Sequence, residues 1–182
     1  RSGAFSAWDL ASVERRWLGP LAGHTARLTA IAWSPDGARV ATVAHDGDVR
    51  VWSPTTGECL ARWRVSHTSS PLGELPARLT TCAWAPDARR VTVGADTGHL
   101  TTFDVDTGER TSWRAHPAEV TACAWSPDGA LLASTSRRGD LRLWTEDLRQ
   151  ATVQVERSGL SRASCLSFSR DGARLLTAGT GS

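Results

Sequence analysis

Three residues near the start of the chain have the types that a nucleophilic active site requires. His24 could act as a general base, Thr42 could supply a hydroxyl nucleophile and Asp46 could orient the histidine, with Trp52 a few residues beyond them. Spacing alone does not exclude a hydrolytic triad of this kind, because the members of known triads lie far apart in sequence. The choice between a catalytic and a structural role depends on whether this stretch is unique.

The stretch is one copy of a repeat. "WSPDGARV" at Trp33 returns as "WAPDARRV" at Trp84, "WSPDGALL" at Trp125 and "FSRDGARL" at Phe168. Short apolar runs precede and follow each copy, and they are separated by Pro-Asp-Gly or Thr-Gly turns. Runs of this length, rich in β-branched and aromatic residues, predict antiparallel strands joined by hairpins. Four such strands in every 40 to 45 residues indicate the blades of a β-propeller.

The sequence therefore predicts an all-β fold, a β-propeller segment built of four-stranded antiparallel blades. We expect one domain over residues 1–182 that holds three complete blades and two half-blades. The complete blades fall at about 24–66, 67–115 and 116–157, and the half-blades at about 1–18 and 158–182.

The pattern resembles the WD-repeat β-propeller family. Gly23-His24 stands before a first strand, "SPDG" follows it, and Trp8-Asp9 or Phe103-Asp104 closes a third strand. The resemblance covers nearly the whole chain, although Ala115-His116 departs from Gly-His and Trp52-Ser53 from Trp-Asp. Rings of this family usually have about seven blades, so we expect that missing sequence completes the ring and that the chain is a piece of a longer protein. Closure into four blades and exchange between two chains are the alternatives.

The resemblance gives the opening residues a structural role. It implies that His24, Thr42, Asp46 and Trp52 form a buried hydrogen-bond chain that fastens one blade, because a buried imidazole and a buried indole each need a partner. A partial copy keeps the histidine, the hydroxyl and the indole as His116, Ser134 and Trp144. Thr97 and Arg138 replace the aspartate in the later blades.

No residue pattern predicts a catalytic, metal or cofactor site. Cys82 and Cys123 occupy the repeat position that Ile31 fills in the first copy, which favours apolar core residues over a zinc or disulfide pair. "DVDTG" from Asp104 resembles the start of a calcium loop, but the later acidic ligand is absent and a strand-closing turn explains it. We expect no cofactor and no enzyme activity in these residues.

The basic residues are unusual because all 21 of them are arginine. The absence of lysine excludes a phosphate-loop lysine and Schiff-base catalysis. Lysine, asparagine, tyrosine and methionine are all missing, which favours a bacterial genome of high GC content over selection for phosphate binding. The net charge of +2 is small and the arginines are spread along the chain, whereas nucleic-acid binders cluster their positive charge. An arginine-mediated nucleic-acid binder is therefore the alternative function and not the first choice.

The nine tryptophans have places in the repeat. Trp33, Trp84 and Trp125 close first strands, which favours packing between blades. The tryptophans of the outer strands, Trp63 among them, could instead form stacking platforms for nucleic acid or carbohydrate.

Two loop positions align in all blades and are the candidate partner-binding residues. Arg27, Arg78, Glu119 and Arg162 precede the first strands, whereas His45, Asp96 and Arg137 lie at or beside the turn between the second and third strands. The resemblance implies that both positions line the mouth of the central channel. Arginine pairs well with carboxylates, which favours a protein or peptide with an acidic segment, although ordinary solvated charge is the alternative.

An insertion lengthens one loop on the same face. Between His67 and Leu79 the sequence "HTSSPLGELPARL" adds eight residues relative to the matching loops, and it contributes His67, Leu72 and Glu74 as candidate contacts. Loops longer than their equivalents are often functional, and a tolerated surface bulge is the alternative.

Together these features predict a non-catalytic protein-interaction or sensor module. No apolar run is long enough for a membrane span and no signal peptide is present, so we expect a cytoplasmic protein without a membrane partner. The resemblance further suggests the C-terminal part of a larger bacterial signalling protein, an NTPase or a kinase, in which missing sequence or another chain completes the ring.

Overall fold

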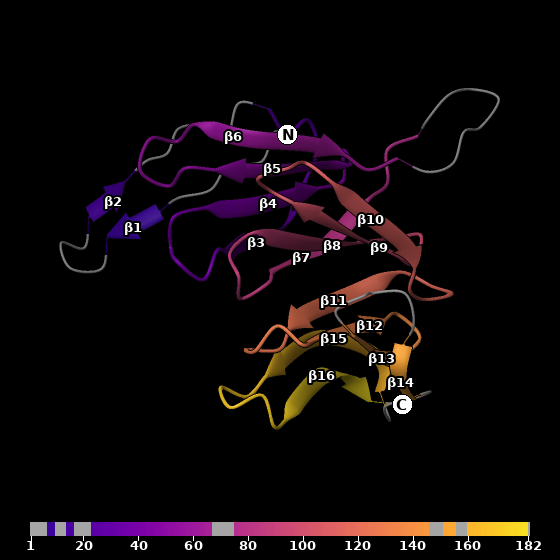
Figure 1. The fold of residues 1–182 in the computed structure, drawn as a ribbon. Helices are drawn as coiled ribbons and strands as arrows, with labels where there is room; N and C mark the ends of the chain where they lie inside the picture. Colours follow the sequence, from indigo (N-terminus) through magenta and orange to yellow (C-terminus); the bar gives the residue numbers. More distant parts are fainter. Residues whose placement is uncertain are drawn as a thin grey trace.

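Three four-stranded antiparallel sheets and two two-stranded sheets make up the part of the chain that the structure describes, as Figure 1 shows. The computed structural model describes residues 7–9, 14–16, 23–66, 75–145, 151–155 and 160–181, with side chains over 23–66, 75–145 and 163–180. The sheets follow one another in chain order, and each complete sheet packs against the next. The predicted all-β propeller architecture is confirmed.

The four-stranded sheets are called blades 1, 2 and 3. Blade 1 contains β3 (Leu28–Trp33), β4 (Val40–Ala44), β5 (Asp48–Trp52) and β6 (Cys59–Arg64). Blade 2 contains β7 (Leu79–Trp84), β8 (Arg90–Ala95), β9 (His99–Asp104) and β10 (Arg110–Arg114). Blade 3 contains β11 (Val120–Trp125), β12 (Leu131–Ser136), β13 (Leu141–Thr145) and β14 (Ala151–Val155).

Two shorter sheets lie at the ends of the chain. β1 (Ala7–Asp9) pairs with β2 (Glu14–Arg16), and β15 (Leu160–Phe168) pairs with β16 (Leu175–Gly181). β15 packs beside β11 of blade 3, which continues the series of blades. No helix in the described part of the chain is long and apolar enough to cross a membrane.

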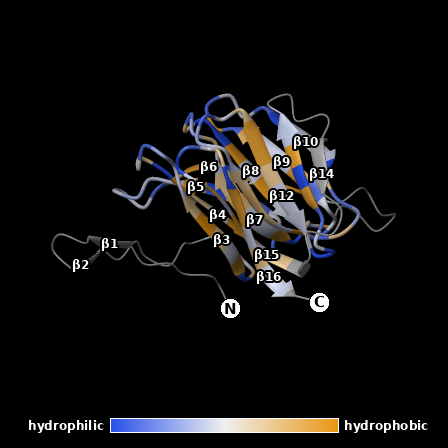
Figure 2. Cartoon of the chain, turned by 90° about the horizontal axis from the view of Figure 1, so that it is seen from below, coloured by the Kyte–Doolittle hydropathy of each residue, from blue (hydrophilic) through white to orange (hydrophobic). Residues whose placement is uncertain are grey.

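The two middle strands of blade 1 are its most buried elements. Every residue of β4 and β5 is buried, because these strands have a neighbouring strand on both edges and side chains packed on both faces. The outer strand β6 alternates between exposed and half-buried residues, as expected for an edge strand with one solvated face. Figure 2, coloured by hydropathy, shows apolar stretches in the strands and hydrophilic turns at their ends.

The apolar core lies between adjacent blades. One cluster joins Val43 and Val51 of blade 1 to Leu79 and Trp84 of blade 2. A second cluster joins blades 2 and 3. Each interface also contains an indole hydrogen bond, from Trp84 Nε1 to the Ala32 carbonyl oxygen at 3.1 Å and from Trp125 Nε1 to Thr92 Oγ1 at 3.1 Å. Burial of a full-sized apolar side chain stabilises the fold by roughly 1.5–3 kcal/mol, so these interfaces hold the blades together.

The predicted burial of the first-strand side chains holds for the two cysteines and not for Ile31 and Trp33. Cys82 and Cys123 are buried between blades, and burial raises the pKa of both thiols, that of Cys123 to about 12. Ile31 does hold the equivalent strand position, since it lies opposite Thr42 as Cys82 lies opposite Val93. Its burial differs, however, because Ile31 and Trp33 are 52% and 55% exposed. Both side chains lie on the face of blade 1 that is turned away from blade 2, and no described four-stranded blade covers that face.

Glycine is required where the β8–β9 turn of blade 2 lies against the segment that leads into blade 3. Gly98, in the hairpin between β8 and β9, has φ +81°, and a Cβ there would lie 2.2 Å from the His116 carbonyl oxygen. The Gly98 carbonyl oxygen accepts hydrogen bonds from the N–H groups of Ala115 and His116. This close approach fixes the start of blade 3 and, with it, the position of His116.

Candidate functional site

The structure brings His24, Thr42, Asp46 and Trp52 together in blade 1. Trp52 Nε1 donates to Thr42 Oγ1 at 2.8 Å, and Thr42 Oγ1 lies 2.9 Å from His24 Nε2. His24 Nδ1 lies 3.2 Å from both carboxylate oxygens of Asp46. All four residues are buried, so the hydroxyl that a nucleophilic mechanism would need is closed off from substrate.

One tautomer satisfies every donor of this chain. If His24 carries its proton on Nδ1, that N–H donates to Asp46, and Nε2 accepts the Thr42 hydroxyl, whose oxygen accepts the Trp52 N–H. Burial lowers the pKa of His24, although the hydrogen bond to Asp46 acts in the opposite direction. Burial alone would raise the pKa of Asp46, but the N–H groups of Asp48 and Thr25 donate to its carboxylate and leave that pKa lowered.

Blade 3 keeps part of this chain and loses its last link. Trp144 Nε1 donates to Ser134 Oγ at 2.9 Å, and His116 Nε2 lies 2.8 Å from the same oxygen. Arg138 stands where blade 1 has Asp46, and the buried His116 Nδ1 has no hydrogen-bond partner among the described residues. Burial, together with the charge of Arg142, lowers the pKa of His116 to about 4.

Blade 2 replaces the hydroxyl and the indole together. The strand register places Val93 opposite Thr101 and Val91 opposite Phe103, so Val93 and Phe103 take the places of Thr42 and Trp52. Both side chains are buried. An exchange of both partners for apolar groups leaves no unsatisfied donor, which is why it is tolerated.

A second repeated contact was not predicted from the sequence repeat. Arg50 Nη2 donates to the carbonyl oxygen of Gly23 at 2.7 Å, and Arg142 Nη1 donates to that of Ala115 in blade 3. Each arginine therefore ties a third strand to the loop before the histidine. Its sequence signal is the arginine shared by "DVRVW" and "DLRLW", but the carbonyl that it reaches depends on the path of the loop.

His24, Asp46 and Asp48 lie close enough together to be tested as metal ligands. Asp48 already forms ion pairs with Arg50, Arg62 and Arg64, and the Asp46 carboxylate already accepts backbone N–H groups. Guanidinium groups at this distance would repel a cation, so the donor set does not fit a metal ion.

The "DVDTG" segment is a turn. Asp104 Oδ1 accepts the N–H groups of Asp106 and Thr107 at 3.0 and 2.9 Å. Arg89 lies within ion-pair distance of Asp104 and Asp106. These contacts engage the carboxylates that a calcium ion would need, so the strand-closing turn accounts for the segment.

The candidate partner-binding residues are brought together by a backbone bond repeated in each blade. The N–H of His45 donates to the Arg27 carbonyl oxygen in blade 1. The same bond joins Asp96 to Arg78 in blade 2, and Arg137 to Glu119 in blade 3, all at 2.9–3.0 Å. The hairpin turn of each blade is thus fixed beside the entry to its first strand. We call the surface formed by these six residues the mouth.

The mouth encloses two adjoining hollows. The first, of about 340 Å³, is lined by Arg27, Thr29, His45, Thr80, Glu119, Thr121 and Ser164. The second, of about 410 Å³, is lined by His45, Arg78, Thr80, Asp96, Glu119 and Arg137. They share His45, Thr80 and Glu119, so residues of blades 1, 2 and 3 and of β15 face one continuous surface.

The charges of the mouth are unevenly compensated. Arg137 Nη1 lies 3.4 Å from Glu119 Oε2 and forms an ion pair within blade 3. Within the described residues, Arg27 and Arg78 form no such ion pair. The uncompensated positive charge therefore lies on the side of blades 1 and 2.

The threonines of the mouth hold adjacent blades together, and the sequence comparison did not select them. Thr29 Oγ1 donates to the Leu79 carbonyl oxygen of the next blade at 2.8 Å, and Thr80 Oγ1 donates to that of Val120 at 2.6 Å. Their signal is the threonine at the second position of "LTAIAW", "LTTCAW" and "VTACAW". These bonds make the wall of the mouth rigid, which favours a preformed binding surface.

Four of the predicted contact residues cannot be placed. His67, Leu72 and Glu74 lie outside the described residues, and so does the side chain of Arg162. The backbone of Arg162 pairs with Thr180 in the last two-stranded sheet. Their part in the mouth stays a prediction.

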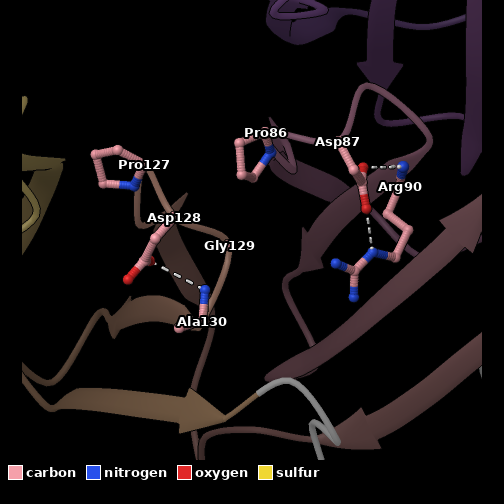
Figure 3. Close-up of a pocket in the computed structure, with 7 residues that line it drawn as sticks. All are labelled: Pro86, Asp87, Arg90, Pro127, Asp128, Gly129 and Ala130. Atoms are coloured by element: carbon pink, nitrogen blue, oxygen red, sulfur yellow. Dashed lines mark hydrogen bonds and ion pairs between the residues drawn. The ribbon is translucent and has the colours of Figure 1, made fainter.

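A third hollow lies at the opposite ends of the strands and is shown in Figure 3. It is lined by Pro86, Asp87, Arg90, Pro127, Asp128, Gly129 and Ala130. Asp87 accepts from the backbone N–H and the Nε of Arg90, and Asp128 accepts from the N–H of Ala130. The polar groups are thus engaged within their own turns, whereas the cations of blades 1 and 2 at the mouth are not, so the mouth is the better candidate site.

Comparison with known proteins supports the repeat assignment. The family model "WD domain, G-beta repeat" matches residues 16–53 and 108–145. A WD repeat-containing protein 26 homolog of Arabidopsis thaliana is 28% identical over 94 residues, 52% of this chain and 14% of that protein. Eukaryotic translation initiation factor 3 subunit I of Debaryomyces hansenii is 27% identical over 141 residues, 74% of this chain and 37% of that protein. The chain thus spans well under half the length of either relative.

A solved structure shares the fold. A chain in the crystal structure of a mitotic checkpoint complex superposes with a TM-score of 0.82 at 18% sequence identity. The superposition covers 96% of this chain and 50% of the other. At this identity the likeness concerns the fold alone.

Proposed function

From the WD40 repeats that this chain carries, we propose that it is a non-catalytic protein-interaction module of a WD-repeat propeller. Proteins of this type generally serve as scaffolds that bind other proteins. The mouth is the binding surface, and its ligand is an acidic segment of a protein or peptide. One observation carries this proposal: residues of three successive blades converge on a rigid surface where Arg27 and Arg78 lack an ion-pair partner among the described residues.

The arrangement favours carboxylates for an electrostatic reason. A guanidinium group offers paired N–H donors that match the two oxygens of a carboxylate. Asp96, beside Arg78 in blade 2, and Glu119 in blade 3 disfavour a uniformly anionic ligand. A peptide with a few acidic residues and apolar neighbours therefore fits better than a polyphosphate chain.

The wider context is part of the proposal. An exclusively arginine-based set of basic residues fits a bacterial protein of high GC content. We place the module in the cytoplasm, at the C-terminal side of a larger signalling protein with an NTPase or kinase domain. Further sequence or another chain would complete the ring, because the matched relatives are much longer than this chain.

Peptide binding tests the proposed surface. A fluorescein-labelled dodecapeptide of alternating glutamate and leucine is titrated with the wild-type chain and with the Arg27→Glu/Arg78→Glu variant, and anisotropy is measured. We expect the variant to lose at least about tenfold in affinity for the peptide, because two attractive pairs become repulsive. The Arg170→Glu/Arg174→Glu variant carries the same charge change on the exposed turn at the opposite end of β15 and should bind as the wild type does.

Two results would contradict this function. Equal binding by the wild type and the mouth variant would remove the mouth as the site. Preference for a single-stranded oligonucleotide, with an affinity that falls steeply between about 50 and 200 mM salt, would favour the nucleic-acid alternative. A peptide contact that combines polar and apolar groups should weaken less over that range.

A further inference from the structure

We propose that the outer edge of blade 1 carries a second binding site, which recognises a phosphoryl group through Arg62, Arg64 and Arg110. This site lies on the outer strands β6 and β10 and shares no residue with the mouth, although Arg64 contacts the backbone of Asp46, next to His45. The argument rests on an excess of guanidinium groups: Arg50, Arg62 and Arg64 surround the buried Asp48 carboxylate, beside which the Asp46 carboxylate also lies.

Asp48 is the centre of this cluster. Its side chain is 2% exposed, and Arg50 Nη2 and Arg62 Nη2 lie 3.0 and 2.9 Å from its Oδ2. Arg64 Nε lies 3.4 Å from its Oδ1. One carboxylate therefore faces three guanidinium groups. Arg50 is buried and also donates a hydrogen bond to the Gly23 carbonyl oxygen, whereas the side chains of Arg62 and Arg64 are 54% and 57% exposed.

The other blades show that the fold does not require these two arginines. In blade 3 the register places Gln154 opposite Arg142, and the sequence has Glu156 at the position of Arg64. Arg142 nevertheless makes the same contact to the preceding loop that Arg50 makes. In blade 2 the position of Arg62 is Ser112. The position of Arg64 in blade 2 is Arg114. The combination of both arginines is thus peculiar to blade 1.

A fourth guanidinium group comes from the neighbouring blade. Arg110, at the start of β10, is exposed, and its Nη1 donates to the Arg64 carbonyl oxygen at 3.3 Å. Arg64 Nη2 in turn lies 3.4 Å from the Asp46 carbonyl oxygen. These contacts hold the two arginines at the interface of the outer strands, where both remain open to solvent.

The charge of the cluster favours a phosphoryl group. Asp48 orients Arg62 and Arg64 from behind, which reduces the conformational entropy that two long side chains would lose on binding. A phosphate monoester carries about −1.5 to −2 charges and three strong acceptor oxygens at neutral pH. It can therefore engage more than one guanidinium fork at once, whereas a single carboxylate offers only two oxygens.

Calorimetry with two phosphate sources tests this site. The full chain is titrated with inorganic phosphate and with a phosphoserine decapeptide, and the serine and glutamate forms of the peptide serve as references. We expect the phosphoserine peptide to bind about tenfold more tightly than its serine form. Binding of inorganic phosphate at a similar affinity would identify the free ion as the ligand, and weaker binding would indicate that the peptide contributes contacts.

The matched variant borrows the residues of blade 3. Arg62→Gln/Arg64→Glu reproduces Gln154 and Glu156, and we expect it to lose at least about tenfold in phosphate affinity. Arg170→Gln/Arg174→Glu has the same charge change elsewhere and should bind as the wild type does. Arg110→Gln, which leaves Asp48 and its partners in place, should weaken binding about threefold and serves if the double variant fails to fold.

Several results would overturn this inference. These are no measurable binding of either inorganic phosphate or the phosphoserine peptide by the wild type, equal binding by the Arg62→Gln/Arg64→Glu variant with native melting, or an equal loss in the Arg170→Gln/Arg174→Glu control. The mouth variant Arg27→Glu/Arg78→Glu should retain phosphate binding while it loses the acidic peptide. Failure of one site is therefore distinguishable from failure of the other.

Discussion

Trp52 Nε1 donates a hydrogen bond to Thr42 Oγ1 at 2.8 Å, inside a blade where both residues are buried. This bond begins a chain that runs through His24 to Asp46 and ends on backbone N–H groups of the same blade. The chain connects the loop before the blade with its second and third strands. Its members therefore act as one unit, and their contributions to stability should be coupled.

Removal of the last member should destabilise the chain clearly. Asp46→Ala leaves the Nδ1–H of His24 and the N–H groups of Thr25 and Asp48 without their acceptor. We expect the free energy of unfolding to fall by about 1–3 kcal/mol, the cost of leaving buried donors unsatisfied. Urea denaturation measures this. Glu58→Ala, at an exposed position, should change stability by less than about 0.5 kcal/mol, and an equally small change for Asp46→Ala would contradict the role of the chain.

Blade 2 suggests how the hydroxyl and the indole are coupled. Thr42→Val alone should cost about 1–3 kcal/mol because it leaves the buried Trp52 N–H without an acceptor. Thr42→Val/Trp52→Phe copies Val93 and Phe103, so the double variant should lose less than the sum of the two single losses. A double-mutant cycle from denaturant melts provides the coupling energy. Strictly additive losses would show that the two side chains act independently.

The third prediction concerns acid. Burial lowers the pKa of His116 to about 4, below its value of about 6.5 in an unfolded chain. The unfolded chain therefore binds the proton more tightly, so the stability contribution is complete above about pH 6.5 and is lost as the pH falls toward 4. Between pH 7 and 5 this residue should cost roughly 2 kcal/mol. His24, whose pKa is also lowered, acts in the same direction.

Two variants separate His116 from other acid effects. His116→Gln should flatten the dependence of stability on pH between 7 and 5, as measured by urea melts at each pH. Arg138→Asp restores the acceptor that Asp46 provides in blade 1; it should raise the pKa of His116, followed by NMR, and stabilise the fold at pH 7 by about 1 kcal/mol. Parallel pH profiles for the wild type and His116→Gln would show that this histidine does not govern the acid response.

The repeat made most strands predictable, because equivalent positions in a propeller have equivalent neighbours, and the resemblance to WD-repeat propellers predicted the blade 1 hydrogen-bond chain. It could not predict the exposure of Trp33, since that depends on a neighbouring blade and not on Trp33 itself. The cluster around Asp48 was also hidden. Arg50, Arg62 and Arg64 come together only through the pairing of β5 with β6, whose register a sequence motif does not state.

The last prediction concerns the turn after the first strand of blade 2. Ala88 has φ +57°, whereas the equivalent positions in the other turns are Gly37, Gly129 and Gly172, with φ near +70°. A left-handed conformation costs a residue with a Cβ roughly 1–2 kcal/mol, and glycine would remove this strain. Glycine also increases the entropy of the unfolded chain, which offsets part of the stabilisation. Ala88→Gly should therefore stabilise the fold by roughly 0.5–1 kcal/mol.

Two neighbouring substitutions make this test specific to the backbone conformation. Ala130→Gly lies one residue beyond Gly129 and outside the left-handed region, so it should destabilise by roughly 0.5–1 kcal/mol through entropy alone. Gly129→Ala should destabilise more, because it adds strain at φ +74° and brings a Cβ to 3.1 Å from Pro86 Cγ. Thermal melts should thus rank Ala88→Gly above the wild type and Gly129→Ala lowest. A loss of stability in Ala88→Gly would show that entropy in the unfolded chain outweighs the strain at this turn.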